Sequence, residues 1–169
     1  PGETVMRSQM ALFLARVIDY AVDTGAVEAP AEIVDPGFSD TSALSQEAKD
    51  AIALLYTLGV TQGTTATTFS PYADVTRRDM ASFMVRLQNL LEQDSYATGE
   101  SFFSDVPDTM PRGADINALA AQGIAVGYGD GTYAPSASVL RSQMALFIMR
   151  HIDENVEAGR LPALQPAEM

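Results

Sequence analysis

The chain repeats itself in register, and this repeat limits its fold more than any other feature. Residues 59 to 86 align without a gap with residues 123 to 150, 64 positions further on. The matching pairs are Gly59 and Gly123, Gly63 and Gly127, Phe69 and Tyr133, Pro71 and Pro135, Arg77 and Arg141, Met80 and Met144, Phe83 and Phe147, and Arg86 and Arg150. The start of the chain carries the second half of the same unit at an offset of 70, with Pro1, Arg7, Met10, Ala11, Phe13 and Arg16 on Pro71, Arg77, Met80, Ala81, Phe83 and Arg86. One half unit and two whole units predict stacked supersecondary elements that share a core.

Each whole unit contains two stretches in which apolar residues recur at helical spacing. In unit 2 the first stretch runs from Ala48 to Leu58 and is stopped by Gly59, and Thr76 is a good N-cap for a second helix beginning near Arg77. The second helix of units 1, 2 and 3 carries the apolar sets Met10, Phe13, Leu14 and Val17; Met80, Phe83, Met84 and Leu87; and Met144, Phe147, Ile148 and Ile152. The sequence therefore predicts a mainly α-helical fold with three equivalent second helices and two first helices.

The unit spacing divides the chain into four segments. Residues 1–34 hold the second half of unit 1 and a linker, 35–100 hold unit 2 and a linker, 101–157 hold unit 3, and 158–169 form a tail or a linker to a following segment. Because the first residue falls inside a unit, we expect the sequence to be a piece of a longer protein. The tail resembles the linker after unit 1, so we expect it either to lead into a further unit or domain or to fold back over the space left by the missing first helix of unit 1.

The composition excludes several classes of function. The net charge of -12, from 22 acidic and ten basic residues, argues against a general attraction to nucleic acid or anionic lipid. An anionic partner would have to bind at a local basic spot. The chain has no cysteine, which excludes disulfides and thiolate metal sites, and it has no apolar run near the roughly 20 residues that span a bilayer.

The residues also argue against catalysis. The single histidine, His151, falls at the stripe position of Val17 and Leu87, which favours a core role. With one histidine and no cysteine, a His-based triad has no alternative base, and imidazole-rich metal clusters are excluded. The sequence predicts no enzyme, no metal site and no cofactor, and the abundant acids leave only weak Ca²⁺ binding at interfaces open.

The ordered signals resemble the S-layer homology (SLH) repeat. The order is Phe-Ser-Asp, a helix, a glycine-containing loop, an aromatic residue two positions before proline, and an arginine that opens an amphipathic helix. The segments from Arg7 to Arg16 and from Arg141 to Arg150 look most like the versions in actinobacterial secreted proteins. The resemblance implies three repeats with pseudo-threefold symmetry, whose second helices form a central bundle. It also implies an extracellular location at the cell wall or cell surface, and binding of a secondary cell-wall polysaccharide, often pyruvylated, in grooves between repeats.

Three arginines are the first candidates for glycan binding. Arg7, Arg77 and Arg141 each open a second helix, where a planar charged fork lies beside free backbone amides and the positive end of the helix dipole. This arrangement suits a carboxylate. The alternative is that these arginines pair with acids of a neighbouring unit or are only solvated.

Four further candidates have a structural alternative that we rank first. Asp40 and Asp105 precede the first helices, where capping or turn formation comes before contact with a sugar hydroxyl. Gly63 and Gly127 are expected to permit a turn of positive φ or a close backbone approach, and contact with a sugar comes second.

The loop of unit 3 offers two candidates that the loop of unit 2 does not. Tyr128 supplies a stacking face and Asp130 a hydroxyl acceptor, whereas their counterparts are Thr64 and Ala66. If this loop binds sugar, the two whole units differ in binding.

Two functions from different classes remain open. The first is a non-catalytic anchor that binds an acidic cell-wall polysaccharide between repeats. The second is a structural or assembly module that associates with itself or with a surface protein. The family often has Thr-Arg-Ala-Glu where this chain has Met6-Arg7-Ser8-Gln9, Thr76-Arg77-Arg78-Asp79 and Leu140-Arg141-Ser142-Gln143, so the ligand is the open question.

Overall fold

The computed structural model describes residues 2–92 and 100–163, and these residues form five helices. The helices are α1 (Arg7–Asp23), α2 (Gln46–Thr57), α3 (Arg77–Leu91), α4 (Gly113–Ala121) and α5 (Arg141–Glu157). Within the described residues, extended backbone contributes only three isolated bridges. The prediction of a mainly α-helical chain is confirmed.

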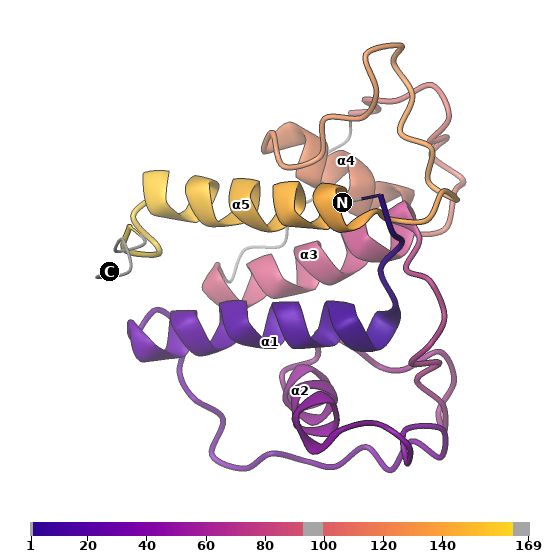
Figure 1. The fold of residues 1–169 in the computed structure, drawn as a ribbon. Helices are drawn as coiled ribbons and strands as arrows, with labels where there is room; N and C mark the ends of the chain where they lie inside the picture. The colour runs from indigo at the N-terminus through magenta and orange to yellow at the C-terminus, as the bar shows by residue number, and fades with distance from the viewer. Residues whose placement is uncertain (1, 93–99, 164–169) are drawn as a thin grey trace.

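The second helices of the three units form the centre of the molecule. Figure 1 shows α1, α3 and α5 side by side and running in the same direction. The segments that precede these helices are joined by three backbone hydrogen bonds. The amide of Val5 donates to the carbonyl of Val139 (2.9 Å), the amide of Val139 to the carbonyl of Val75 (2.8 Å), and the amide of Val75 to the carbonyl of Val5 (2.9 Å). These valines hold equivalent positions in the three units, so the closed ring of hydrogen bonds confirms the pseudo-threefold arrangement.

The same symmetry ties each second helix to the next unit. The amide of Arg7 donates to the carbonyl of Ala73, that of Arg77 to Ala137 and that of Arg141 to Glu3, at 2.8 to 2.9 Å. Thr76 is the N-cap of α3, as predicted, and its hydroxyl accepts the amide of Asp79. Each helix start therefore lies against backbone from the neighbouring unit.

The first helices cover the second helices of the preceding units. α2 packs on α1, and α4 packs on α3. The fully buried side chains come from both kinds of helix and from the loops, and include Leu14, Ile52, Phe69, Met80 and Leu119. The core is thus continuous between units, as expected for stacked repeats.

The single histidine lies in this core. His151 is fully buried, which confirms its predicted place, and neither ring nitrogen has a hydrogen-bond partner among the described residues. Burial lowers its pKa to about 4, and the positive charge of Arg160 acts in the same direction. The folded protein therefore holds the neutral imidazole well below the usual pKa of a histidine.

This burial predicts a loss of stability in mild acid. Between about pH 6.5 and 4 the unfolded chain binds a proton at residue 151 and the folded chain does not, so the free energy of unfolding falls as the pH falls. The full effect of this shift is about 3 kcal/mol. The variant His151→Leu, which copies Leu87, should lose this component. Denaturant titrations of both proteins between pH 7.5 and 4 measure it, and parallel pH profiles would contradict it.

Candidate functional site

Arg77 is held between rings and backbone at the start of α3. Its side chain is 5% exposed, and its Nε donates to the Tyr133 carbonyl at 2.7 Å. The guanidinium carbon lies 4.4 Å from the ring centroid of Tyr133, 5.0 Å from that of Tyr128 and 5.7 Å from that of Phe147. No described acidic residue forms a salt bridge with Arg77. The remaining donors of a rigid, preorganised cation are left for another partner.

A cavity of about 190 Å³ opens beside this arginine. We call it the Arg77 groove, and its lining residues are Arg77, Val126, Gly127, Tyr128, Gln143, Leu146, Phe147 and Arg150. Across it, Gln143 Nε2 donates to the Tyr128 hydroxyl at 3.3 Å, and Arg150 reaches the Ile124 carbonyl at 3.5 Å. The lining holds two guanidinium groups and no carboxylate, which favours a bound anion.

Arg7 repeats this geometry against unit 2. It is 7% exposed, its Nε donates to the Phe69 carbonyl at 2.8 Å, and its guanidinium carbon lies 4.8 Å from the Phe69 centroid and 5.3 Å from that of Phe83. Burial lowers the pKa of Arg7 below its usual value. By repeat equivalence, the residues around Arg7 that match the lining of the Arg77 groove are Gln62, Gly63, Thr64, Asp79, Ser82, Phe83 and Arg86.

Arg141 lies in a different environment. It is exposed, its backbone amide is bound by Glu3, and it borders an apolar cavity of about 350 Å³ with Phe13, Met144, Ala145, Ile148 and Met149. In repeat register, the carbonyl that would match Phe69 and Tyr133 falls before Pro1, outside this sequence. The described residues therefore bring Arg7 and Arg77 against a neighbouring turn, and do not bring Arg141 against one.

Asp40 and Asp105 hold those turns in place. The two carboxylate oxygens of Asp40 accept the amides of Phe69 and Ser70, and those of Asp105 accept the amides of Tyr133 and Ala134, at 2.7 to 2.9 Å. Ser70 and Ala134 have φ of 58° and 54°, a region that costs energy for residues other than glycine. The aspartates therefore stabilise strained turns 28 to 30 residues further along the chain.

This finding corrects part of the expectation for the two aspartates. Turn formation was expected, but neither residue caps the helix that follows it. The N-cap of α2 is Ser45 and that of α4 is Arg112. Both carboxylates already accept backbone amides.

The glycines permit a close approach, as expected. Gly63 and Gly127 have φ of 80° and 62°. A Cβ would lie 2.6 Å from the Thr68 carbonyl oxygen at Gly63 and 2.6 Å from the Thr132 carbonyl oxygen at Gly127, and would also meet the rings of Phe38 and Phe103. The glycines let each loop pack on the ring of the Phe-Ser-Asp turn.

In the loop of unit 3, Tyr128 is exposed and Asp130 is hydrogen-bonded within the loop. Tyr128 is 42% exposed and lines the Arg77 groove. Asp130 accepts the hydroxyl of Thr132 at 2.7 Å and its amide at 3.0 Å, and these hydrogen bonds lower its pKa. In unit 2 the equivalent of Tyr128, Thr64, instead bonds to Thr68 and Ser70 within its own loop.

Comparison with known proteins identifies the repeat. The model of the S-layer homology domain matches residues 37–81 and 102–145, more than half of the chain. The chain belongs to the S-layer homology domain family. Domains of this family are non-catalytic modules that bind cell-wall polysaccharide and hold proteins at the cell wall or cell surface.

Two relatives agree with this placement of the SLH chain. It is 30% identical over 120 residues to a cell surface protein of Thermoanaerobacter kivui, covering 68% of this chain and 16% of that protein. It is 29% identical over 154 residues to an uncharacterised cell wall amidase of Bacillus anthracis, covering 88% of this chain and 25% of that protein. The chain thus spans a quarter or less of the relatives' lengths, and the activity in the second name belongs to that protein.

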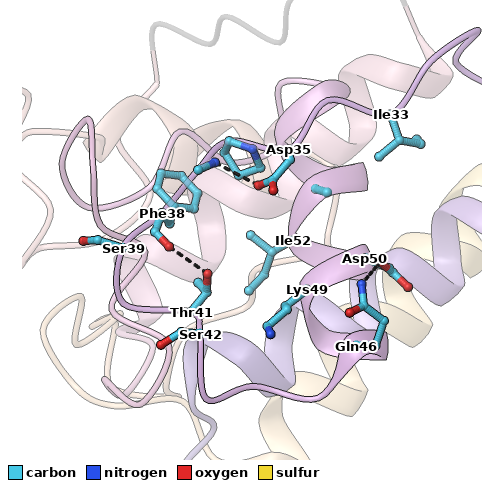
Figure 2. Close-up of a pocket in the computed structure, with 13 residues that line it drawn as sticks. Ile33, Asp35, Phe38, Ser39, Thr41, Ser42, Gln46, Lys49, Asp50 and Ile52 are labelled. Atoms are coloured by element: carbon cyan, nitrogen blue, oxygen red, sulfur yellow. Dashed lines mark hydrogen bonds between the residues drawn. The ribbon is translucent and has the colours of Figure 1, made fainter.

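A larger cavity of the SLH chain lies beside α2. Its volume is about 620 Å³, and Figure 2 shows Gln46, Lys49 and Asp50 of α2 facing the segment from Ile33 to Ser42. Its charged groups are two carboxylates, Asp35 and Asp50, and one ammonium, Lys49. This lining does not favour an anion, and it includes none of the predicted site residues.

Sequence reasoning missed the two other polar residues of the Arg77 groove, and its apolar residues Val126, Leu146 and Phe147. Gln143 appeared only as a departure from the family motif, and Arg150 only as a match in the repeat. Each carried a usable signal, because the two residues share one face of the helix that Arg141 opens, at i and i+7 with Phe147 at i+4 between them, and this face is turned away from Arg141. Phe147 gave the same signal.

Searches of the described residues for two other kinds of site found none. No group of three or more acidic, histidine or cysteine side chains is placed to hold a metal ion, and the expectation of weak Ca²⁺ binding stays untested. No described helix combines the length and apolar character needed to cross a membrane.

The turn aspartates give a stability prediction. Asp105→Ala should lower the free energy of unfolding by about 2 kcal/mol, because it leaves two amides without their charged acceptor and a residue of positive φ without support. Thermal unfolding followed by circular dichroism measures it. The control Asp108→Ala removes an exposed carboxylate of the same segment and should stay within about 0.5 kcal/mol. Equal effects of the two substitutions would contradict the assigned role.

Proposed function

We propose that this SLH chain anchors its parent protein to the cell envelope by binding an acidic secondary cell-wall polysaccharide, such as a pyruvylated one, in the Arg77 groove. The chain acts without catalysis and works outside the cell. The observation that carries this proposal is Arg77 itself: a buried, ring-packed guanidinium that borders a cavity containing a second arginine and no acid.

The electrostatics of the chain support a local anion site. With a net charge of -12, the molecule as a whole repels polyanions, so an acidic glycan must be bound where basic groups converge. Arg77 and Arg150 converge at the groove. A carboxylate that bonds to a preorganised guanidinium in a partly enclosed site gains a charge-assisted, directional contact.

The other groove residues suit the sugar that carries the carboxylate. Tyr128 offers an exposed ring face, and Gln143 and the backbone of the unit 3 loop offer neutral donors and acceptors. Sugar rings commonly stack on aromatic faces while their hydroxyls bond to amides. Asp130 remains a proposed hydroxyl acceptor at the edge of this loop, with its carboxylate exposed.

Binding of purified cell-wall polysaccharide tests the proposal. Arg77→Lys keeps the charge and removes the planar fork, and Tyr128→Thr copies the residue of unit 2. Each should reduce the fraction of chain that sediments with the polysaccharide, with a fall in affinity of about tenfold for Arg77→Lys. Arg78→Ala removes the neighbouring arginine, which does not line the groove, and should bind like the wild type.

Two further measurements make this test specific. Circular dichroism confirms that each variant is folded, since Arg77 is buried. Mild acid removes pyruvate ketals from the polysaccharide, and the treated material should bind less of the wild-type chain. Unchanged sedimentation of both groove variants would refute the assignment.

Self-association is the second candidate, and one surface favours it. On α1, Leu12 and Ala15 line a space shared with Ala51 and Leu54 of α2. The matching residues of α5 are Leu146 and Met149, which are 51% and 46% exposed. An uncovered apolar helix face of this kind is a feature of association surfaces.

Light scattering over a concentration series tests self-association. It should show a species heavier than the 18.0 kDa chain, and Met149→Glu should remove that species because it places a charge on the apolar face. A monomer at all concentrations would exclude association through this face.

A further inference from the structure

Two buried amides join α3 to α5, which pack directly on each other. Gln88 and Asn155 are both fully buried. Gln88 Nε2 donates to Asn155 Oδ1 at 2.9 Å, and Asn155 Nδ2 donates to Gln88 Oε1 at 2.7 Å. The two side chains thus form a reciprocal pair between the helices, in the half of α3 that lies away from Arg77.

The surroundings complete the hydrogen bonding of Asn155. Its Nδ2 also donates to the His151 carbonyl at 2.7 Å, and its Oδ1 also accepts Nη1 of Arg160 at 3.2 Å. Arg160 in turn pairs with Glu92 at 2.7 Å. The pair is therefore the centre of a network that joins α3, α5 and the residues that follow α5.

The repeat has apolar residues at the matching positions of the other second helices. The counterparts of Gln88 are Ile18 and Ile152, and those of Asn155 are Ala21 and Leu91. The amide pair therefore belongs to the contact between α3 and α5 and is not repeated elsewhere in the bundle.

A buried amide pair contributes less to stability than to the choice of partner. Each amide loses its hydration on folding, and the mutual hydrogen bonds only offset that cost, so an apolar pair of similar volume would stabilise the contact about as well. Any arrangement that separates the two amides, however, buries one of them without its partner. Such pairs select one packing among several that apolar contacts alone would allow.

The bundle needs this selection because two of its helices begin alike. Residues 7–13 of α1 and 141–147 of α5 have the same sequence, Arg-Ser-Gln-Met-Ala-Leu-Phe. By this segment alone, α1 of the same chain or of another copy could lie beside α3 in place of α5. However, α1 carries Ala21 where α5 carries Asn155, and the alanine side chain offers Gln88 no hydrogen bond.

The choice of neighbour decides whether the Arg77 groove forms. Its lining combines Arg77 of α3 with residues of α5 and with the loop of unit 3. That loop also carries Tyr128 and Tyr133, whose rings pack on Arg77. Because the loop leads into α5, only α5 brings it to Arg77.

We propose that Gln88 and Asn155 are positioning residues: their pairing selects α5, and not α1, as the neighbour of α3, and thereby assembles the Arg77 groove. The selection concerns the arrangement of the helices, so it goes beyond the proposed function and can be tested without a glycan.

Distances between spin labels test the selection, and the lack of native cysteine makes the labelling specific. Labels at the exposed positions of Asn89→Cys in α3 and Asp153→Cys in α5 should give one narrow distance distribution. Gln88→Ile combined with Asn155→Leu copies the matching residues of the repeat. This apolar variant should unfold at about the same denaturant concentration as the labelled parent and should show a second distance.

Two control variants separate positioning from stability. Gln88→Asn combined with Asn155→Gln exchanges the two amides and should show the single distance of the parent. Gln88→Ile alone leaves one N–H of Asn155 without its acceptor, so it should unfold at a lower denaturant concentration than the apolar variant.

The outcomes that would overturn the proposal are distinct from those that bear on the ligand. A single unchanged distance in the folded apolar variant would overturn the selection. An apolar variant that does not fold, or that unfolds as easily as Gln88→Ile, would show that the pair serves stability instead.

Sedimentation with wall polysaccharide links the selection to the groove. The binding of the apolar variant should fall in proportion to the population with the second distance, because only molecules with α5 beside α3 have the groove. Full binding in spite of a second distance would overturn this link. No binding by the wild type would remove the proposed function and leave the selection of α5 standing.

Discussion

The ring of hydrogen bonds joining Val5, Val75 and Val139 is the constraint on which the other features depend. It fixes three extended segments around one axis, and α1, α3 and α5 start from these segments and run side by side in the same direction. Because α1 and α3 begin directly after their segments, Arg7 and Arg77 lie beside the turn of the following unit. A groove in this molecule is therefore a product of two units, and neither unit could form it alone.

The second essential interaction joins the parts of one unit. Asp40 and Asp105 each connect the beginning of a unit to a turn near its middle. Those turns supply the carbonyls of Phe69 and Tyr133 that hold Arg7 and Arg77. The aspartates thus position the arginines without touching them. The role in turn formation that was ranked first for these aspartates thus extends to a turn about 30 residues away in the sequence.

The sequence predicted the architecture better than the site. Apolar spacing located the helices, Gly59 marked the end of a first helix, and Thr76 and Arg77 marked the start of a second one, because these signals are local. The roles of Asp40 and the burial of Arg7 were not predictable in this way, since both depend on contacts between residues 28 or more positions apart. The repeat placed three arginines at equivalent sequence positions, but it could not give the environment of each. The structure instead gives Arg141 an exposed position and gives Arg7 and Arg77 different neighbours at residues 79 and 143.

The central claim is that an acidic wall sugar binds beside Arg77, and amide-resolved NMR tests it most directly. In a titration of the ¹⁵N-labelled chain with pyruvylated cell-wall oligosaccharide, the Nε–H of Arg77 and the amides of Gly127 and Tyr128 should shift together in a saturable way. Resonances around the α2 cavity, including those of Lys49 and Asp50, should stay in place. Saturable shifts at the α2 cavity with an unchanged Arg77 would contradict the account.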